Sequence, residues 1–155
     1  MTRWTAAVGL IVVIILVIGG FLMTKPGDPL IAEGLADLEQ ALGRAVEMVK
    51  PSAPPERENN PWPCRTEGKS AFSVDVDLKS ADPQAAVTTL LAFWRKAGFR
   101  VEVDRSADPD RPWAVVGGRL IEMSIHGFPD RGTVWIGGNT ICLGGEVPGS
   151  WRGVL

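Results

Sequence analysis

The sequence predicts an α+β domain carried on a membrane-spanning helix. An unbroken apolar run lies near the N-terminus, an amphipathic helical pattern follows it, and alternating strand patterns surround one helix in the C-terminal part. We expect a two-layer domain with that one helix packed on a mostly antiparallel sheet of four or five strands. The expected division is anchor 1–27, amphipathic stalk helix 28–50, Pro-rich linker 51–63 and α+β domain 64–155.

The apolar run from Ala6 to Met23 contains 18 residues and no charge. As a helix it would span roughly 27 Å, close to the hydrocarbon thickness of a bilayer. A cleaved signal peptide would have a shorter apolar stretch that ends in a small-x-small site, and no cysteine closely follows the run to accept a lipid. The pattern therefore predicts one retained span.

The orientation of this span is predicted mainly from the two cysteines. One cation flanks the run on each side, Arg3 before it and Lys25 after it, so the distribution of positive charge favours neither orientation. Cys64 and Cys142 stand at the start and end of the predicted domain, which suits one disulfide in an oxidising compartment. Such a bridge would stabilise the fold by roughly 4 kcal/mol in the chain-entropy model. Two buried free thiols are the alternative. We expect a cell-membrane protein with a cytoplasmic N-terminus and an extracytoplasmic domain.

The charge balance argues against nucleic acid as a partner. The chain carries 16 Lys and Arg against 18 Asp and Glu, a formal net charge of -2. A chain of this charge has no general attraction for phosphate backbones.

A helix is predicted directly after the span, from the capping pair Asp28 and Pro29 to Pro51. Its apolar residues recur at alternating spacings of four and three and form one seam. The seam consists of Ile31, Leu35, Leu38, Leu42, Ala45 and Val49. It would pack on its own domain or the bilayer edge, or it would pair the stalk with a second copy or another membrane protein.

The segment 51–63 reads PSAPPERENNPWP, with five prolines and little apolar content. This composition predicts an extended, semi-stiff spacer between stalk and domain.

The domain is expected to open with a strand, a helix and a second strand. Residues 72–78 alternate apolar and polar side chains, which is the period of a strand with one wet face. Asp82 and Pro83 start a helix that ends before Gly98. The alternation resumes over 99–103 and predicts the next strand.

A meander of short strands follows. Gly117 and Gly118 are the predicted tight turn between strands over 113–116 and 119–126. The segment 127–132 turns the chain into a strand over 133–136. Gly137 and Gly138 are then expected to form a turn before a last short strand over 141–143.

His126 is the only histidine and the only candidate general base, with Glu122 on the same strand face as a candidate partner. An exposed or hydrogen-bonded strand-end histidine is the alternative interpretation. The segment from Glu67 to Ser70 resembles the end of a phosphate-binding loop, but it lacks the first glycine and the preceding strand. No catalytic residue and no cofactor are therefore predicted.

Two aspartate pairs are candidate ligands for a hard cation such as calcium. Asp75 and Asp77 share a strand face, and Asp108 and Asp110 share a loop. Neither pair has the number of oxygen ligands that calcium requires. A solvated strand face and a turn explain them, and no metal site is predicted.

Three tryptophans have no clear burial pattern and form the candidate surface for a ligand or partner. They are Trp62, Trp113 and Trp151. Exposed indoles anchor protein interfaces or stack on sugar rings. Trp94, by contrast, has the helical spacing of a core residue.

The span, the Pro-rich spacer and the enclosing pair Cys64 and Cys142 give a layout that resembles small actinobacterial envelope proteins. Those proteins are membrane-anchored or lipid-anchored, carry a cysteine-closed α+β domain and mostly lack an assigned activity. The missing lipid-attachment cysteine departs from the lipid-anchored members. The resemblance implies a location in the cell envelope and no functional residues.

Together these features predict a non-enzymatic binding or adaptor module that engages a protein or cell-envelope ligand. One alternative is a structural subunit of a membrane complex that contacts its partners through span and stalk. The other is an envelope hydrolase or metal-dependent enzyme that uses His126.

Overall fold

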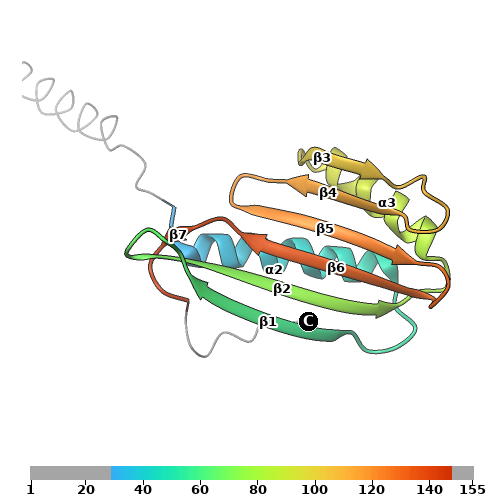
Figure 1. Ribbon diagram of the computed structural model, residues 1–155, viewed down its shortest axis with the longest axis horizontal. Coiled ribbons are helices and arrows are strands. Elements are labelled where there is room, and N and C mark those ends of the chain that lie inside the picture. Colours follow the sequence, from blue (N-terminus) through green and yellow to red (C-terminus); the bar gives the residue numbers. More distant parts are fainter. Residues whose placement is uncertain (1–28, 148–155) are drawn as a thin grey trace, which may run out of the picture.

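The computed structural model of the protein describes residues 29–147, which form an α+β domain with two layers (Figure 1). The elements are α2 (Ile31–Val49), β1 (Glu56–Pro63), β2 (Lys69–Lys79), α3 (Pro83–Lys96), β3 (Arg100–Arg105), β4 (Trp113–Gly117), β5 (Ile121–Phe128), β6 (Thr133–Thr140) and β7 (Leu143–Gly144). The predicted α+β class is confirmed. The sheet is larger than expected, and two helices rather than one pack on it.

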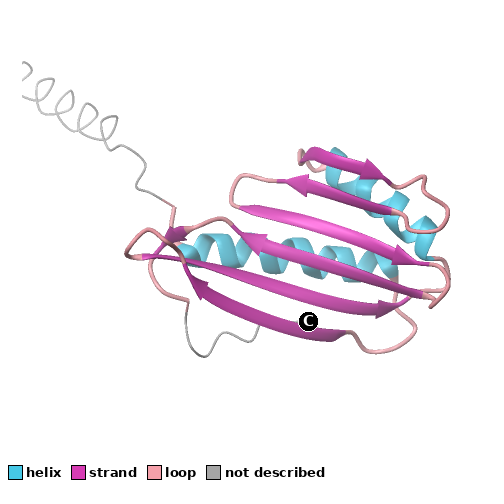
Figure 2. Cartoon of the chain, in the orientation of Figure 1, coloured by secondary structure: helices cyan, strands magenta, loops and turns pink. Residues whose placement is uncertain are grey.

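The strands form a single antiparallel sheet in the order β1-β2-β6-β5-β4-β3. The short strand β7 pairs with the beginning of β2. Both helices lie behind the sheet in the view of Figure 2, so the face turned toward the reader carries no helix. One face of the sheet is therefore covered and the other is open.

The helix predicted as a stalk is instead part of the domain. In α2, Ile31, Leu35, Leu38 and Leu42 are buried against the sheet, and Val49 packs at the edge of the same core. Gly138 of β6 permits the close approach, since a Cβ there would overlap Leu38 Cδ1. The seam packs on the chain's own sheet because that sheet offers a large apolar face. It is thus not a free surface for a second copy.

The start of α2 also differs from the prediction. Leu30 occupies the N-cap position and makes no side-chain capping hydrogen bond, so the helix begins at Ile31. The expected cap Asp28 lies outside the described residues.

The second part of the predicted linker 51–63 forms a strand. Residues 56–63 form the edge strand β1, whose Asn59 lies opposite Val74 of β2. Arg57 extends from β1 to α2 and donates two hydrogen bonds to the Glu39 carboxylate, at 2.9 and 3.0 Å. Prolines are tolerated because an edge strand needs partners on one side only. The segment is therefore fixed to both layers rather than acting as a spacer.

Helix α3 begins and ends as predicted. The Asp82 carboxylate accepts a hydrogen bond from the Ala85 backbone N–H at 2.9 Å, and Gly98 follows the helix with φ +88°. The chain also turns after β4, but not at Gly117 and Gly118 as predicted. Gly117 is the last residue of β4 and β5 begins at Ile121, so the turn lies over 118–120, and the Gly118 N–H donates to the Ile121 carbonyl at 2.7 Å. The turn predicted at Gly137 and Gly138 is wrong, because both residues lie inside β6. Their small size serves packing on the two faces.

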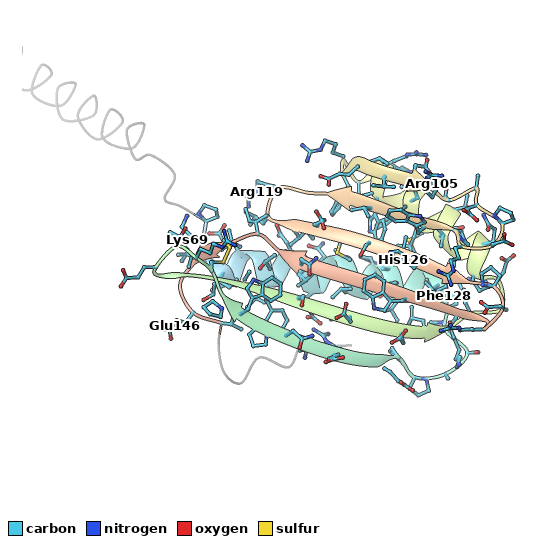
Figure 3. All side chains as sticks on the ribbon, in the orientation of Figure 1. Lys69, Arg105, Arg119, His126, Phe128 and Glu146 are labelled. Atoms are coloured by element: carbon cyan, nitrogen blue, oxygen red, sulfur yellow. A yellow bond between two sulfur atoms is a disulfide. The ribbon has the colours of Figure 1, made fainter. Side chains whose placement is uncertain are left out.

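The predicted disulfide between Cys64 and Cys142 is present, with a sequence separation of 78. It joins the end of β1 to the start of β7, and both strands flank the beginning of β2. Figure 3 shows the bridge beside Lys69. The bridge thus links the end of the edge strand β1 covalently to the last strand, β7, at one end of the sheet.

Over residues 29–147 no helix has the length and apolar character needed to cross a membrane. The predicted span from Ala6 to Met23 lies outside this range, as does Trp151.

Candidate functional site

The open face of the sheet differs in chemistry from the covered face. Side chains toward the helices are aliphatic and fully buried at the centre of the sheet, as at Val74, Ile125 and Ile136. Alternate residues of the same strands point to the other side, where no described element covers them. The face seen in Figure 3 is therefore the surface on which a site can be sought.

Three aromatic rings from neighbouring strands form a row across this open face. Trp113 of β4 lies opposite His126 of β5, and His126 lies opposite Trp135 of β6. The Trp113 and His126 rings are stacked, with centroids 5.2 Å apart and an interplanar angle of 14°. The His126 and Trp135 rings meet edge to face, also at 5.2 Å. All three side chains are half-buried. We call Trp113, His126 and Trp135 the aromatic row.

A glycine fixes the position of one of these rings. A Cβ at Gly137 would overlap Trp135 Cη2 and would lie 2.8 Å from Trp135 Cζ2 and 2.9 Å from Ser124 Oγ. The Trp135 indole therefore leans along β6 over Gly137. Any larger residue at 137 would displace the ring from the aromatic row.

Four carboxylates adjoin the aromatic row on β1 and β2. Glu56 lies directly opposite Asp77, and Glu58 directly opposite Asp75. Like charges at directly opposed positions destabilise a strand pair. Burial raises the pKa of Asp75, and the charges of Glu58 and Asp77 raise it further. We call Glu56, Glu58, Asp75 and Asp77 the acidic patch.

The patch and the row are joined in register. Asp77 is the partner of Trp135 across β2 and β6, while Arg105 of β3 is the partner of Trp113 at the other margin. A single line across the sheet thus runs from carboxylates through three rings to a guanidinium. Its members are Glu56, Asp77, Trp135, His126, Trp113 and Arg105.

His126 is held as an aromatic residue rather than as part of an acid–base pair. Burial lowers the pKa of the imidazole below its ordinary value near 6.5, so it is neutral at pH 7. Glu122 lies on the same face four residues earlier in β5, roughly 13 Å away along the strand. Among residues 29–147, no carboxylate is hydrogen-bonded to the imidazole. The candidate partner Glu122 is thus not brought to His126.

The second aspartate pair belongs to a turn. The Asp108 carboxylate accepts hydrogen bonds from the backbone N–H groups of Arg111 and Asp110, each at 3.0 Å. These bonds, that of Arg111 first, lower the Asp108 pKa. The described part of the chain contains no group of three or more His, Cys, Asp or Glu side chains placed to hold a metal ion.

Of the three predicted surface tryptophans, Trp113 lies in the aromatic row. Trp62, at 40% exposure, stands at the end of β1 opposite Ala71, away from the row. Trp135 and His126 were not predicted from the sequence as members of this surface. The alternation of Val134 and Ile136 with Trp135 was the available signal that this indole points away from the core.

A hollow on the helix side of the domain has a volume of about 460 Å³. It lies between α2, the end of α3 and the β4–β5 turn, and Phe93 and Phe99 contribute to its wall. Its lining includes Asp37 as well as Arg44 and Arg119, so both signs of charge surround it and no ligand class is favoured.

No protein-family model matches the chain, and no curated protein or solved structure shows significant similarity to it.

Proposed function

We propose that the protein is a membrane-anchored, extracytoplasmic binding module, non-enzymatic, whose binding surface is the open face of the sheet. The observation that supports this most is the aromatic row, three adjoining rings on the face that no described element covers. Half-buried indoles offer large, rigid contact area at low cost in side-chain entropy, which is why they anchor interfaces.

These rings lie outside the main core of the fold. Both helices pack on the opposite face, where aliphatic side chains such as Val76 and Met123 form the core. Aromatic residues on the open face therefore add little to the main core, while they do add an adhesive surface.

The face is a better candidate than the strand edge. The edge strand β1 carries two residues of the acidic patch, and its Pro61 and Pro63 lack the N–H groups that an added strand would use. Such prolines protect an edge against pairing. A partner would accordingly lie over the side chains of the open face.

The envelope location is supported by the apolar run from Ala6 to Met23 and by the disulfide. A membrane-impermeant maleimide added to intact cells after mild reduction tests it. We expect labelling of Cys142, whose residue is exposed, and none without reduction. Labelling only after the cells are opened would place the domain in the cytoplasm.

The binding surface is tested by site-specific photo-crosslinking of the full-length protein in cells. A photo-reactive residue is placed at Val115 or Thr133 on the open face, or at the exposed Ala36 or Ala92 on the helices as matched controls. We expect discrete crosslinked products from the open-face positions only, lost when Trp135→Ala is introduced. Products from the helix positions alone would refute this surface.

The seam of α2 is not proposed as a contact for a membrane complex, because Leu35, Leu38 and Leu42 are buried in the domain.

A further inference from the structure

The open face also indicates the chemistry of its partner. We infer that it binds an extended protein segment bearing lysine or arginine, with the cationic side chains over the acidic patch and Trp135. This inference rests on the proposed function and names the partner class for the same surface.

Carboxylates face one another across β1 and β2. Two neighbouring cross-strand pairs, Glu56 with Asp77 and Glu58 with Asp75, each oppose carboxylate to carboxylate. In the domain alone this arrangement costs stability, since opposed like charges repel. A cation placed between the carboxylates would turn the repulsion into attraction.

A carboxylate of the acidic patch stands beside a ring of the aromatic row. Asp77 stands in register with Trp135, so one cationic side chain can pair with the carboxylate while its alkyl stem or guanidinium lies on the indole. Gly137 lets the ring lie down on the strand. A neutral sugar would use the rings and could donate hydroxyl hydrogen bonds to the carboxylates, but it would bring no positive charge to offset their mutual repulsion.

The line of residues across the open face carries opposite charges at its two ends. The opposite end of the line carries Arg105 next to Trp113. Cations of the partner are therefore attracted to the acidic patch and disfavoured beside Arg105, which sets one direction along this line of residues.

The test uses full-length protein in zwitterionic dodecylphosphocholine micelles and the indole N–H signals in NMR spectra. Trp113→Phe and Trp135→Phe assign the two signals. The probes are a nine-residue peptide of alternating Lys and Thr, the matching Glu and Thr peptide, and the neutral oligosaccharide chitohexaose. We expect a saturable shift of the Trp135 signal with the lysine peptide only.

The charge contribution is tested by Asp75→Asn with Asp77→Asn, against the matched control Glu47→Gln with Glu67→Gln. Both control residues are exposed, on α2 and in the β1–β2 turn, away from the acidic patch. We expect the first pair to weaken lysine-peptide binding about five- to tenfold and the control pair to leave it unchanged.

The outcomes separate the two proposals. No Trp135 shift with the lysine peptide, a shift with chitohexaose instead, or binding indifferent to Asp75→Asn with Asp77→Asn would each overturn the cationic partner. In those cases the proposed binding face still stands or falls with the crosslinks from Val115 and Thr133. Crosslinks confined to the helix positions would overturn the binding face itself.

Discussion

The two faces of this sheet carry different kinds of side chain. The covered face presents aliphatic residues, including Val74, Val76 and Ile136, that are fully buried under α2 and α3. The open face of the same strands presents Trp135, Asp75 and Asp77, which are aromatic or charged. Burial of apolar area accounts for the first set. The second set is not explained by the stability of the domain, and this contrast is what directs attention to binding.

The contrast is visible at adjacent residues. Gly137 and Gly138 are neighbours in β6, and a Cβ added to one would point to the opposite face of the sheet from a Cβ added to the other. Gly138 makes room for Leu38 of α2, while Gly137 makes room for the Trp135 indole. One glycine serves packing and the other serves the aromatic row.

Loss of a core side chain should have the largest effect. Leu38 is fully buried between α2 and the sheet, so we expect Leu38→Ala to lower the free energy of unfolding by about 2–5 kcal/mol. Chemical denaturation measures it, with Trp113→Ala as the open-face counterpart. Trp113→Ala should cost clearly less, and an equal cost would mean that the aromatic row is structural.

The glycine pair gives a sharper comparison. We expect Gly138→Ala to cost about 1–3 kcal/mol, because its methyl would overlap Leu38 and lie near Met123 Sδ. Gly137→Ala should cost less but should abolish the open-face crosslinks and shift the Trp135 indole signal, since it displaces the ring. Identical behaviour of the two variants in both assays would remove the distinction between the faces.

Acidification should lower the free energy of unfolding through His126. Its pKa is lowered in the folded state by burial, so the unfolded chain takes up the proton first as pH falls below about 6.5. The stability associated with neutral His126 is present above that pH and is lost as pH falls toward the folded-state value. We expect wild type to lose more unfolding free energy between pH 7 and pH 5 than His126→Gln. A parallel decline in both proteins would contradict this.

The smallest effect, and one of opposite sign, is expected at Asp75. Because its pKa is raised in the folded state, its ionisation is disfavoured by folding, and stability is lost as pH rises through the folded-state value. Asp75→Asn should therefore raise the melting temperature slightly at pH 7 and have no such effect below the ordinary aspartate value. A lower melting temperature at pH 7 would show that the carboxylate makes a stabilising contact.

Local patterns predicted much of this fold. Asp82, Pro83 and Gly98 marked the limits of α3 because caps and terminators act within a few residues. The alternation over 72–78 marked β2 for the same reason, since side-chain direction has a period of two. These signals require no knowledge of distant contacts.

Other features depended on distant partners. The seam of α2 was visible in the sequence, but its partner was not, because a sheet, a second helix and a bilayer edge all accept one apolar stripe. β1 was hidden by its prolines and becomes a strand through pairing with β2. The aromatic row likewise depends on sheet order, which places Trp113, His126 and Trp135 on adjacent strands and which single-strand patterns do not encode.

The disulfide divides the chain into a covalent ring and the segments on either side of it. The ring runs from Cys64 to Cys142, and α2 lies outside it, connected to β1 only through residues 50–55. A protease that cuts the exposed loop at 107–111 would leave both fragments joined until a reductant is added. A cut within 50–55 would separate α2 covalently from the sheet. The helix would then be held by packing, by the Arg57–Glu39 and Arg119–Glu33 ion pairs, and by the hydrogen bond from the Gly144 N–H to the Pro29 carbonyl. Separation of the sheet from the N-terminal part of the chain is thus governed by one short segment and by the contacts of one helix.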